Sequence, residues 1–118
     1  MIRVGIARST DGSVRRLTAT GHAVAGPLGG NIVCAAASVL IRTAARALEE
    51  ESGIRLTGGA GARGEFLAEI ESVSPDRLDW VRGVTDSLLR GLEDLAADYP
   101  HEVEVRFEAM EGERRHGT

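Results

Sequence analysis

The chain has 118 residues and a formal net charge of −4, with 42% hydrophobic and 27% charged residues, as in an ordinary globular protein with one modest core. The acidic balance argues against broad nucleic-acid binding, because a phosphate backbone is held by an excess of Lys and Arg. Only Phe66, Trp80, Tyr99 and Phe107 are aromatic, which leaves few rings for a base-stacking platform.

Cysteine and histidine usage points to a cytoplasmic protein without a metal. Cys34 is the only cysteine, so no internal disulfide can form and a reducing compartment is expected. The first residues lack the apolar core of a signal peptide, and no apolar run approaches the roughly 20 residues of a membrane helix. One cysteine and three scattered histidines show no metal-ligand spacing, so we expect neither a metal nor another cofactor.

The first 30 residues predict a hairpin followed by a mobile loop. Residues 2–7 carry apolar side chains at every second position, as a half-buried strand does. Residues 14–20 return as a second strand after the Asp11-Gly12 turn. Residues 21–30 contain four glycines and Pro27, which predict a loop rather than a regular element.

A helix is predicted from residue 32 to about residue 50, with Gly53 as its C-terminal cap. We expect its buried stripe to comprise Ile32, Ala36, Val39, Leu40, Thr43, Ala44 and Ala47.

A short strand-like piece, residues 54–56, leads into a glycine-rich segment and then into an alternating strand over residues 65–70. Residues 59–64 match the pattern G-x-G-x-x-G of dinucleotide sites. That fingerprint must open directly into a helix, whereas a strand is predicted here. We therefore expect a flexible connection and no cofactor site.

A second helix is predicted to begin at Ser74 as N-cap with Pro75 in its first turn, and to end at Pro100. Its expected apolar stripe comprises Leu78, Val81, Leu88, Leu92, Leu95 and Tyr99. Residues 103–107 form the last strand. The order ββαβαβ predicts a small single α/β (α+β) domain over residues 1–110, with a mixed sheet packed against two main helices. Residues 111–118 are polar and expected to fray.

Cys34 and His22 have the residue types of a nucleophile and its general base. Cys34 lies in the predicted first turn of a helix, where the partial positive charge and free N–H groups favour a thiolate and can also hold an oxyanion. His22 lies at the other end of the preceding loop. The alternative readings are a small buried cysteine without chemistry and a solvated turn histidine.

Two further polar residues flank the cysteine. Asn31 is predicted to be the N-cap of the helix, or alternatively to orient His22. Ser38 follows Cys34 by one helical turn, where it can bond near the thiol or back to a helix carbonyl.

The motif itself resembles that of a known family. G-H-A over residues 21–23, followed by G-N-I-V-C-A-A-A-S over residues 30–38, closely resembles the signature of the ribosomal-processing cysteine proteases (Prp family). That signature reads G-H-A, a loop, then G-x-D-I-V-C-A-x-x-S. The resemblance covers nearly the whole chain, including the initial hairpin and the second helix before a last strand.

The resemblance implies a homodimeric α/β protein with a Cys/His dyad that removes the N-terminal extension of a large-subunit ribosomal protein before ribosome assembly. It implies Cys34 as nucleophile, His22 as base, Gly21 as the source of loop freedom and Ser38 as a supporting residue. Asn31 stands where the family usually has aspartate, and a neutral amide stabilises an imidazolium less than a carboxylate does.

Two other functions remain open at this stage. A non-catalytic ribosome-assembly or adaptor protein could retain the same fold. A redox-sensing thiol is a weaker hypothesis, because the chain has no second cysteine to resolve an oxidised one.

Overall fold

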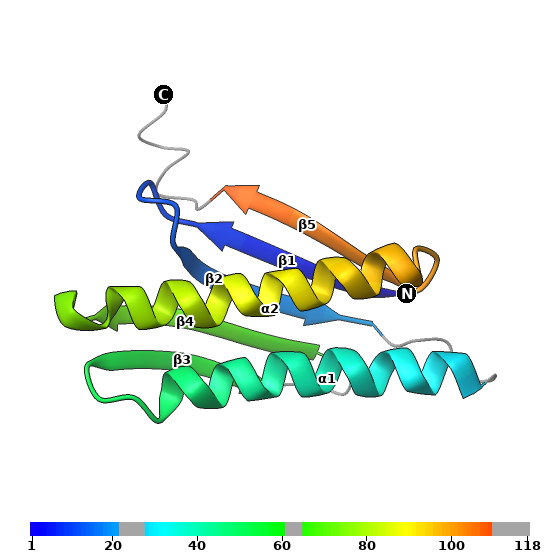
Figure 1. Cartoon of the computed structure of the whole chain (residues 1–118), viewed down its shortest axis with the longest axis horizontal. Helices are drawn as coiled ribbons and strands as arrows, with labels where there is room; N and C mark the ends of the chain where they lie inside the picture. Colours follow the sequence, from blue (N-terminus) through cyan, green and yellow to red (C-terminus); the bar gives the residue numbers. More distant parts are fainter. Residues whose placement is uncertain (22–27, 61–64, 110–118) are drawn as a thin grey trace.

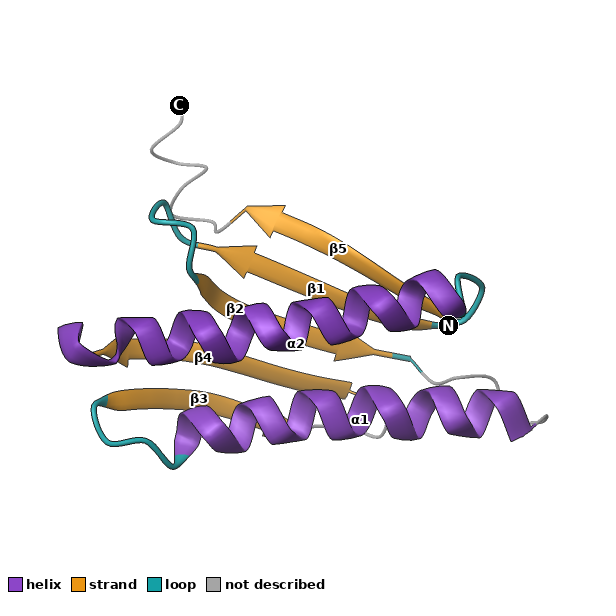
Figure 2. Ribbon diagram, in the orientation of Figure 1, coloured by secondary structure: helices purple, strands orange, loops and turns teal. Residues whose placement is uncertain are grey.

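A mixed five-stranded sheet carries two helices on one face (Figures 1 and 2). The computed structural model describes residues 1–21, 28–60 and 65–109. The elements in chain order are β1 (Ile2–Arg8), β2 (Val14–Thr20), α1 (Leu28–Glu49), β3 (Ile54–Ala60), β4 (Glu65–Val73), the short 3-10 helix η1 (Pro75–Arg77), α2 (Leu78–Asp98) and β5 (Val103–Ala109). Figure 1 shows α1 and α2 side by side, running in opposite directions. No helix within these residues is long and apolar enough to cross a membrane.

The strand order is β3-β4-β2-β1-β5, in which β1 and β5 are parallel and the other neighbours antiparallel. The predicted class, an α+β domain with a mixed sheet and two main helices, is confirmed. The predicted order ββαβαβ did not count β3 as a strand, whereas the observed order is ββαββαβ. Strand β3 extends from Ile54 to Ala60 and pairs with β4 along that length. Gly58 and Gly59 had indicated a connection. Both adopt positive φ within the strand, and a side chain at Gly58 would overlap the carbonyl oxygen of Leu67.

The predicted turn between β1 and β2 is confirmed, and its carboxylate is tightly held. Gly12 has a φ of 86°. Asp11 accepts hydrogen bonds from the Ser13 hydroxyl at 2.6 Å, from the Ser13 amide at 2.9 Å and from the Ser9 hydroxyl. The bonds from Ser13 and Ser9 hold the pKa of the Asp11 carboxyl well below its ordinary value, since they favour the charged form.

The core lies between the sheet and the two helices. Ile2, Val4 and Ile6 of β1 are buried against apolar side chains of both helices, as their alternation predicted. Leu92 of α2 is fully buried in the same cluster. In α2, Val81, Leu88 and Leu92 of the predicted stripe are buried, whereas Tyr99 is 37% exposed just after the helix ends.

The buried face of α1 differs from the predicted stripe. The buried residues are Val33, Ala37, Ile41, Ala44 and Leu48. Ile32 and Val39, which were expected inside, are 59% and 63% exposed. The first half of this helix carries apolar residues on every side, so its periodicity does not define one buried face. In the second half, Leu48 lies in line with the residues that are buried and not with the predicted stripe.

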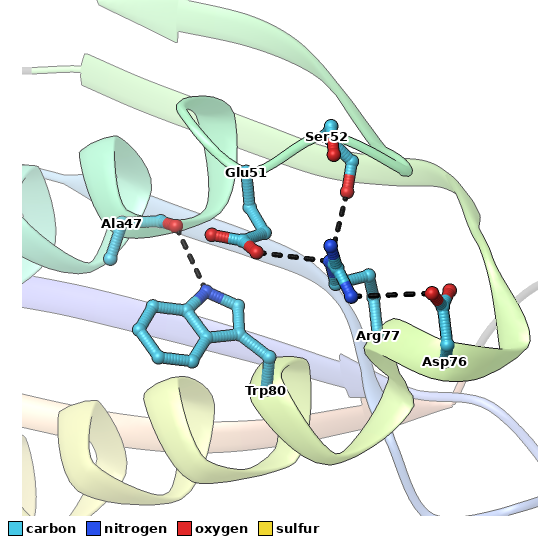
Figure 3. Close-up of polar contacts among 6 residues, drawn as sticks. All are labelled: Ala47, Glu51, Ser52, Asp76, Arg77 and Trp80. Carbon is cyan, nitrogen blue, oxygen red and sulfur yellow. Dashed lines mark hydrogen bonds and ion pairs between the residues drawn. The ribbon is translucent and has the colours of Figure 1, made fainter.

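Side chains from the start of α2 and from η1 contact the C-terminal end of α1 and the turn that follows it (Figure 3). Trp80 donates its indole N–H to the carbonyl of Ala47 at 3.0 Å, and Arg77 donates to the carbonyl of Ser52 at 3.1 Å. Arg77 also pairs with Glu51 at 2.9 Å. The last four carbonyls of a helix lack intrahelical partners, so the Trp80 bond satisfies the Ala47 carbonyl of α1, whereas the Arg77 bond satisfies a carbonyl in the turn after the helix.

Ser74 occupies the N-cap position of η1 with Pro75 next to it, but its side chain forms no capping hydrogen bond. The helix predicted to begin there starts instead as the 3-10 turn η1, and α2 begins at Leu78. Further along, α2 meets α1 at Gly91, where an added Cβ would lie 2.8 Å from the Leu40 side chain.

We expect Trp80→Phe to lower the free energy of unfolding by roughly 0.5–1.5 kcal/mol, because it removes the N–H donor and keeps an aromatic ring. Chemical denaturation of the two proteins measures the difference. Val39→Ala is the control, because the Val39 side chain is exposed and should change stability by less than about 0.5 kcal/mol. An unchanged stability in Trp80→Phe would show that water replaces the indole at no net cost.

Candidate active site

The thiol of Cys34 opens into a cleft between α1 and the strands β2 and β4. The cleft has a volume of about 420 Å³. Cys34 and Ser38 line it from α1, Ala19 and Gly21 from the end of β2, and Phe66 from β4. The lining is mostly apolar with a few polar groups, which is typical of a site for a peptide or small ligand. A hollow of about 470 Å³ between α1 and α2 has no cysteine or histidine in its lining.

Cys34 is half-buried and packs against the main core cluster. Because α1 begins at Leu28, Cys34 lies in its second turn, not in the first turn as predicted. Gly29 and Gly30 belong to the helix, since glycine lowers helix propensity by only about 1 kcal/mol per residue and tertiary packing overrides it. In the second turn of a helix, the backbone amide already bonds a carbonyl one turn earlier. The amides of α1 without an intrahelical partner are therefore those of residues 28–31.

This shift corrects two expectations. Asn31 lies inside α1, so it does not occupy the N-cap position that the sequence favoured. The charge at a helix N-terminus acts mainly over the first turn, so it contributes less at Cys34 than predicted. The loop predicted over residues 21–30 is also shorter, because its last three residues are helical.

Gly21 has a structural role besides the loop freedom predicted for it, which stays a prediction because residues 22–27 lie outside the described residues. Its φ is +90°, and a Cβ at this position would overlap the carbonyl oxygen of Met1. Glycine is therefore required for the turn at the end of β2 and for its close approach to the start of β1. Gly21 is also the residue before His22 in the sequence, and it lines the same cleft as Cys34.

The structure brings three of the five predicted site residues together. Gly21, Cys34 and Ser38 line one cleft. His22 lies outside the described residues, and Asn31 is described only by its backbone. Ser38 is half-buried, and within the part of the chain that the structure describes its hydroxyl has no hydrogen-bond partner. Its predicted bond to a helix carbonyl is therefore not formed with a described residue.

Phe66 and Arg42 are among the cleft residues that sequence reasoning did not assign to the site. Phe66 was recognised as part of an alternating strand, but strand phase shows only the face of the sheet and not the gap between elements. Arg42 follows Cys34 by two steps of four residues, so helical spacing from the cysteine would have found it.

No metal-ligand cluster is present among the described residues. The polar side chains among the residues that line the cleft are the thiol of Cys34, the hydroxyl of Ser38 and the charged groups of Arg42 and Glu65. A thiol in an apolar cleft with a nearby proton acceptor can attack a carbonyl carbon, provided that the acceptor reaches the sulfur.

The chain is similar to a known protein family and to several solved structures. A family model described as cysteine protease Prp matches residues 1–104. The ribosomal processing protease Prp from S. aureus, solved with a covalently linked product peptide, has the same fold with a TM-score of 0.77; it is 23% identical and covers 92% of this chain and 100% of its own. The same protein with a substrate peptide is 22% identical, with the same coverage and a TM-score of 0.77.

SMU.848 from Streptococcus mutans is 26% identical, covers 93% of this chain and 96% of its own, and also has a TM-score of 0.77. A search of curated proteins found no match.

We expect Gly21→Ala to lower the free energy of unfolding by more than about 1 kcal/mol, because alanine is strained at positive φ and its Cβ overlaps a backbone oxygen. Gly83→Ala is the matched control. It lies in α2 with nothing within 4 Å of the added Cβ, so alanine should raise stability by up to about 1 kcal/mol. Equal effects of the two substitutions in urea denaturation would contradict the role assigned to Gly21.

Proposed function

The chain belongs to the cysteine protease Prp family, and we propose that it removes the N-terminal extension of a large-subunit ribosomal protein before ribosome assembly. Family membership makes the chain a cysteine protease, and the proposal concerns the identity of its substrate. The observation that carries the proposal is the cleft in which Cys34 lies beside Ser38 and Gly21. The S. aureus protein of the same fold was solved with a substrate peptide, which supports a peptide as the occupant of this cleft.

In the proposed reaction, His22 takes the proton of the Cys34 thiol and the sulfur attacks the carbonyl carbon of the scissile peptide bond. The tetrahedral intermediate collapses to an acyl-enzyme and releases the new amino terminus, which takes its proton from His22. Water, activated by His22, then hydrolyses the thioester. The position of Gly21 in the cleft supports this assignment, because His22 follows it directly in the chain.

The oxyanion of the intermediate needs hydrogen-bond donors. The free amides of α1 belong to residues 28–31, and helical side chains lean toward the N-terminus of their helix. Cys34 therefore leans toward these amides, although it lies one turn beyond them. This supports a contribution of the helix N-terminus to the oxyanion site.

The proposal also includes a cytoplasmic homodimer without cofactor, as the family resemblance implies. The free thiol of Cys34 is compatible with a reducing compartment. Light scattering of the purified protein tests the dimer, and a mass equal to one chain at all concentrations would contradict it.

We expect Cys34→Ala to lower single-turnover cleavage of the extended ribosomal protein by at least about 10³-fold, because it removes the nucleophile. The fold should persist, since Cys34 is only half-buried and alanine is the best helix former. Cleavage is followed by the mass of the ribosomal protein, beside a thermal melt of each enzyme. Ser38→Ala, one turn along the same helix, is the control and should retain more activity. Undiminished cleavage by folded Cys34→Ala would remove the assignment of Cys34 as nucleophile.

We expect Asn31→Asp to move the acidic limb of the pH–rate profile to higher pH, because a carboxylate favours the protonated form of His22, which then loses its proton at higher pH. Position 31 lies in the first turn of α1, so aspartate should also stabilise the helix by about 0.3–1 kcal/mol. A raised stability with a profile that superimposes on that of the wild type would show that position 31 acts on the helix alone.

A further inference from the structure

Arg42 stands at the far end of the cleft that Cys34 opens into. Cys34, Ser38 and Arg42 follow one another at four-residue steps along α1, a row of neighbours on the helix surface. Arg42 lies eight residues beyond Cys34, which is about 12 Å along the axis at about 1.5 Å per residue. An extended peptide advances about 3.3 Å per residue, so it reaches Arg42 about three or four residues from the carbonyl that the sulfur attacks.

The cleft between these two ends is apolar. Ala37 and Ile41 are buried on its helix side, and Phe66 is half-buried on its sheet side. Phe66 pairs with Ala19 in the register of β2 and β4, so both side chains face the helices. A peptide in this cleft therefore meets apolar surface before it meets the guanidinium.

Arg42 has no carboxylate partner within the described structure, and it is the only one of the described arginines without such a partner that lines the cleft of Cys34. The arginines with such partners are Arg16, Arg55, Arg77, Arg82 and Arg106. Arg42 is exposed, and it also lines the adjoining hollow together with Arg46 and Glu49. Its guanidinium thus offers the planar set of N–H donors that matches a carboxylate.

The other charged residue in the cleft lining, Glu65, stands at the opposite end. It pairs with Thr20, the residue before Gly21, in the register of β2 and β4. Strand alternation directs Glu65 and Phe66 to opposite faces of the sheet, and Phe66 takes the helix-facing side. Glu65 therefore does not neutralise Arg42, and no ion pair joins them.

We propose that Arg42 is a specificity-determining residue, which favours peptides with an acidic side chain about three or four residues from the scissile bond. This inference rests on the proposed function of Cys34 as nucleophile, and it names the substrate class that the same cleft prefers. An exposed ion pair contributes modestly, so the preference over a neutral residue should be about two- to fivefold in kcat/KM, and it should fall as salt rises.

The test uses a panel of peptides that copy the encoded N-terminus of the host ribosomal protein, each with one Asp, Asn or Lys at a single position on either side of the cleavage site. The full-length wild type, Arg42→Gln, Arg42→Glu and Arg90→Glu are compared on this panel. Arg90 is exposed on α2 and is absent from the lining of the cleft, so Arg90→Glu makes the same charge change elsewhere.

We expect the wild type to prefer Asp over Asn at one position about three or four residues from the scissile bond. Arg42→Gln should lose this preference, Arg42→Glu should prefer Lys there, and Arg90→Glu should behave as the wild type. The inference is overturned if Arg42→Glu keeps the wild-type profile, or if Arg90→Glu changes the profile as much as Arg42→Glu does.

A binding measurement separates this inference from the proposed function. Fluorescence anisotropy of the same peptides with Cys34→Ala, and with Cys34→Ala carrying Arg42→Glu, reads the charge preference without any cleavage. If the wild type cleaves no peptide yet these variants show the expected reversal, the function assigned to Cys34 fails and the role of Arg42 stands. If cleavage is efficient and binding shows no reversal, the role of Arg42 fails alone.

Discussion

The seating of α1 on the sheet is the constraint on which the candidate site depends, because Cys34, Ser38 and Arg42 all project from this helix. Five buried residues, Val33, Ala37, Ile41, Ala44 and Leu48, fix its rotation about its own axis. Trp80 bonds the far end of α1 at Ala47 and Arg77 bonds the turn after it at Ser52, so sliding of the helix along its axis would break these bonds. A change in the rotation of α1, or in its position along its axis, would move the Cys34 sulfur relative to the cleft walls formed by β2 and β4.

This seating also explains why α1 starts before its glycines. Burial of a Val or Ile side chain stabilises the folded chain by about 1.5–3 kcal/mol, whereas each glycine lowers helix stability by about 1 kcal/mol. Val33 is fully buried only if the helix has already formed around it. The packing of Val33, the first buried residue of α1 among those whose burial is described, therefore favours a helix that begins one turn earlier than the local propensity predicts.

Elements whose apolar residues follow a single periodic pattern could be predicted from the sequence. Elements whose apolar residues fit more than one pattern could not. Ile2, Val4 and Ile6 alternate unambiguously, and Pro100 marks where α2 must end. The predicted buried face of α1 was wrong because apolar residues surround the first half of this helix. The predicted strand at β3 was too short because glycine usually marks a turn. At the site, the motif identified Cys34 and its neighbours Gly21 and Ser38. It could not identify Phe66, since the meeting of a strand with a helix flank is a property of the assembled fold.

The parallel pairing of β1 with β5 has a consequence for biosynthesis. Ile2 pairs with Val103, so β1 is synthesised about 100 residues before the strand that it pairs with in parallel. Until residues 103–109 emerge from the ribosome, one edge of β1 lacks its hydrogen bonds to β5. The contacts between α2 and β5 are missing as well. Long-range pairing of this kind is slow to form, because the loop that it closes spans nearly the whole domain. The sheet that supports the cleft is therefore completed only after residues 103–109 have been synthesised.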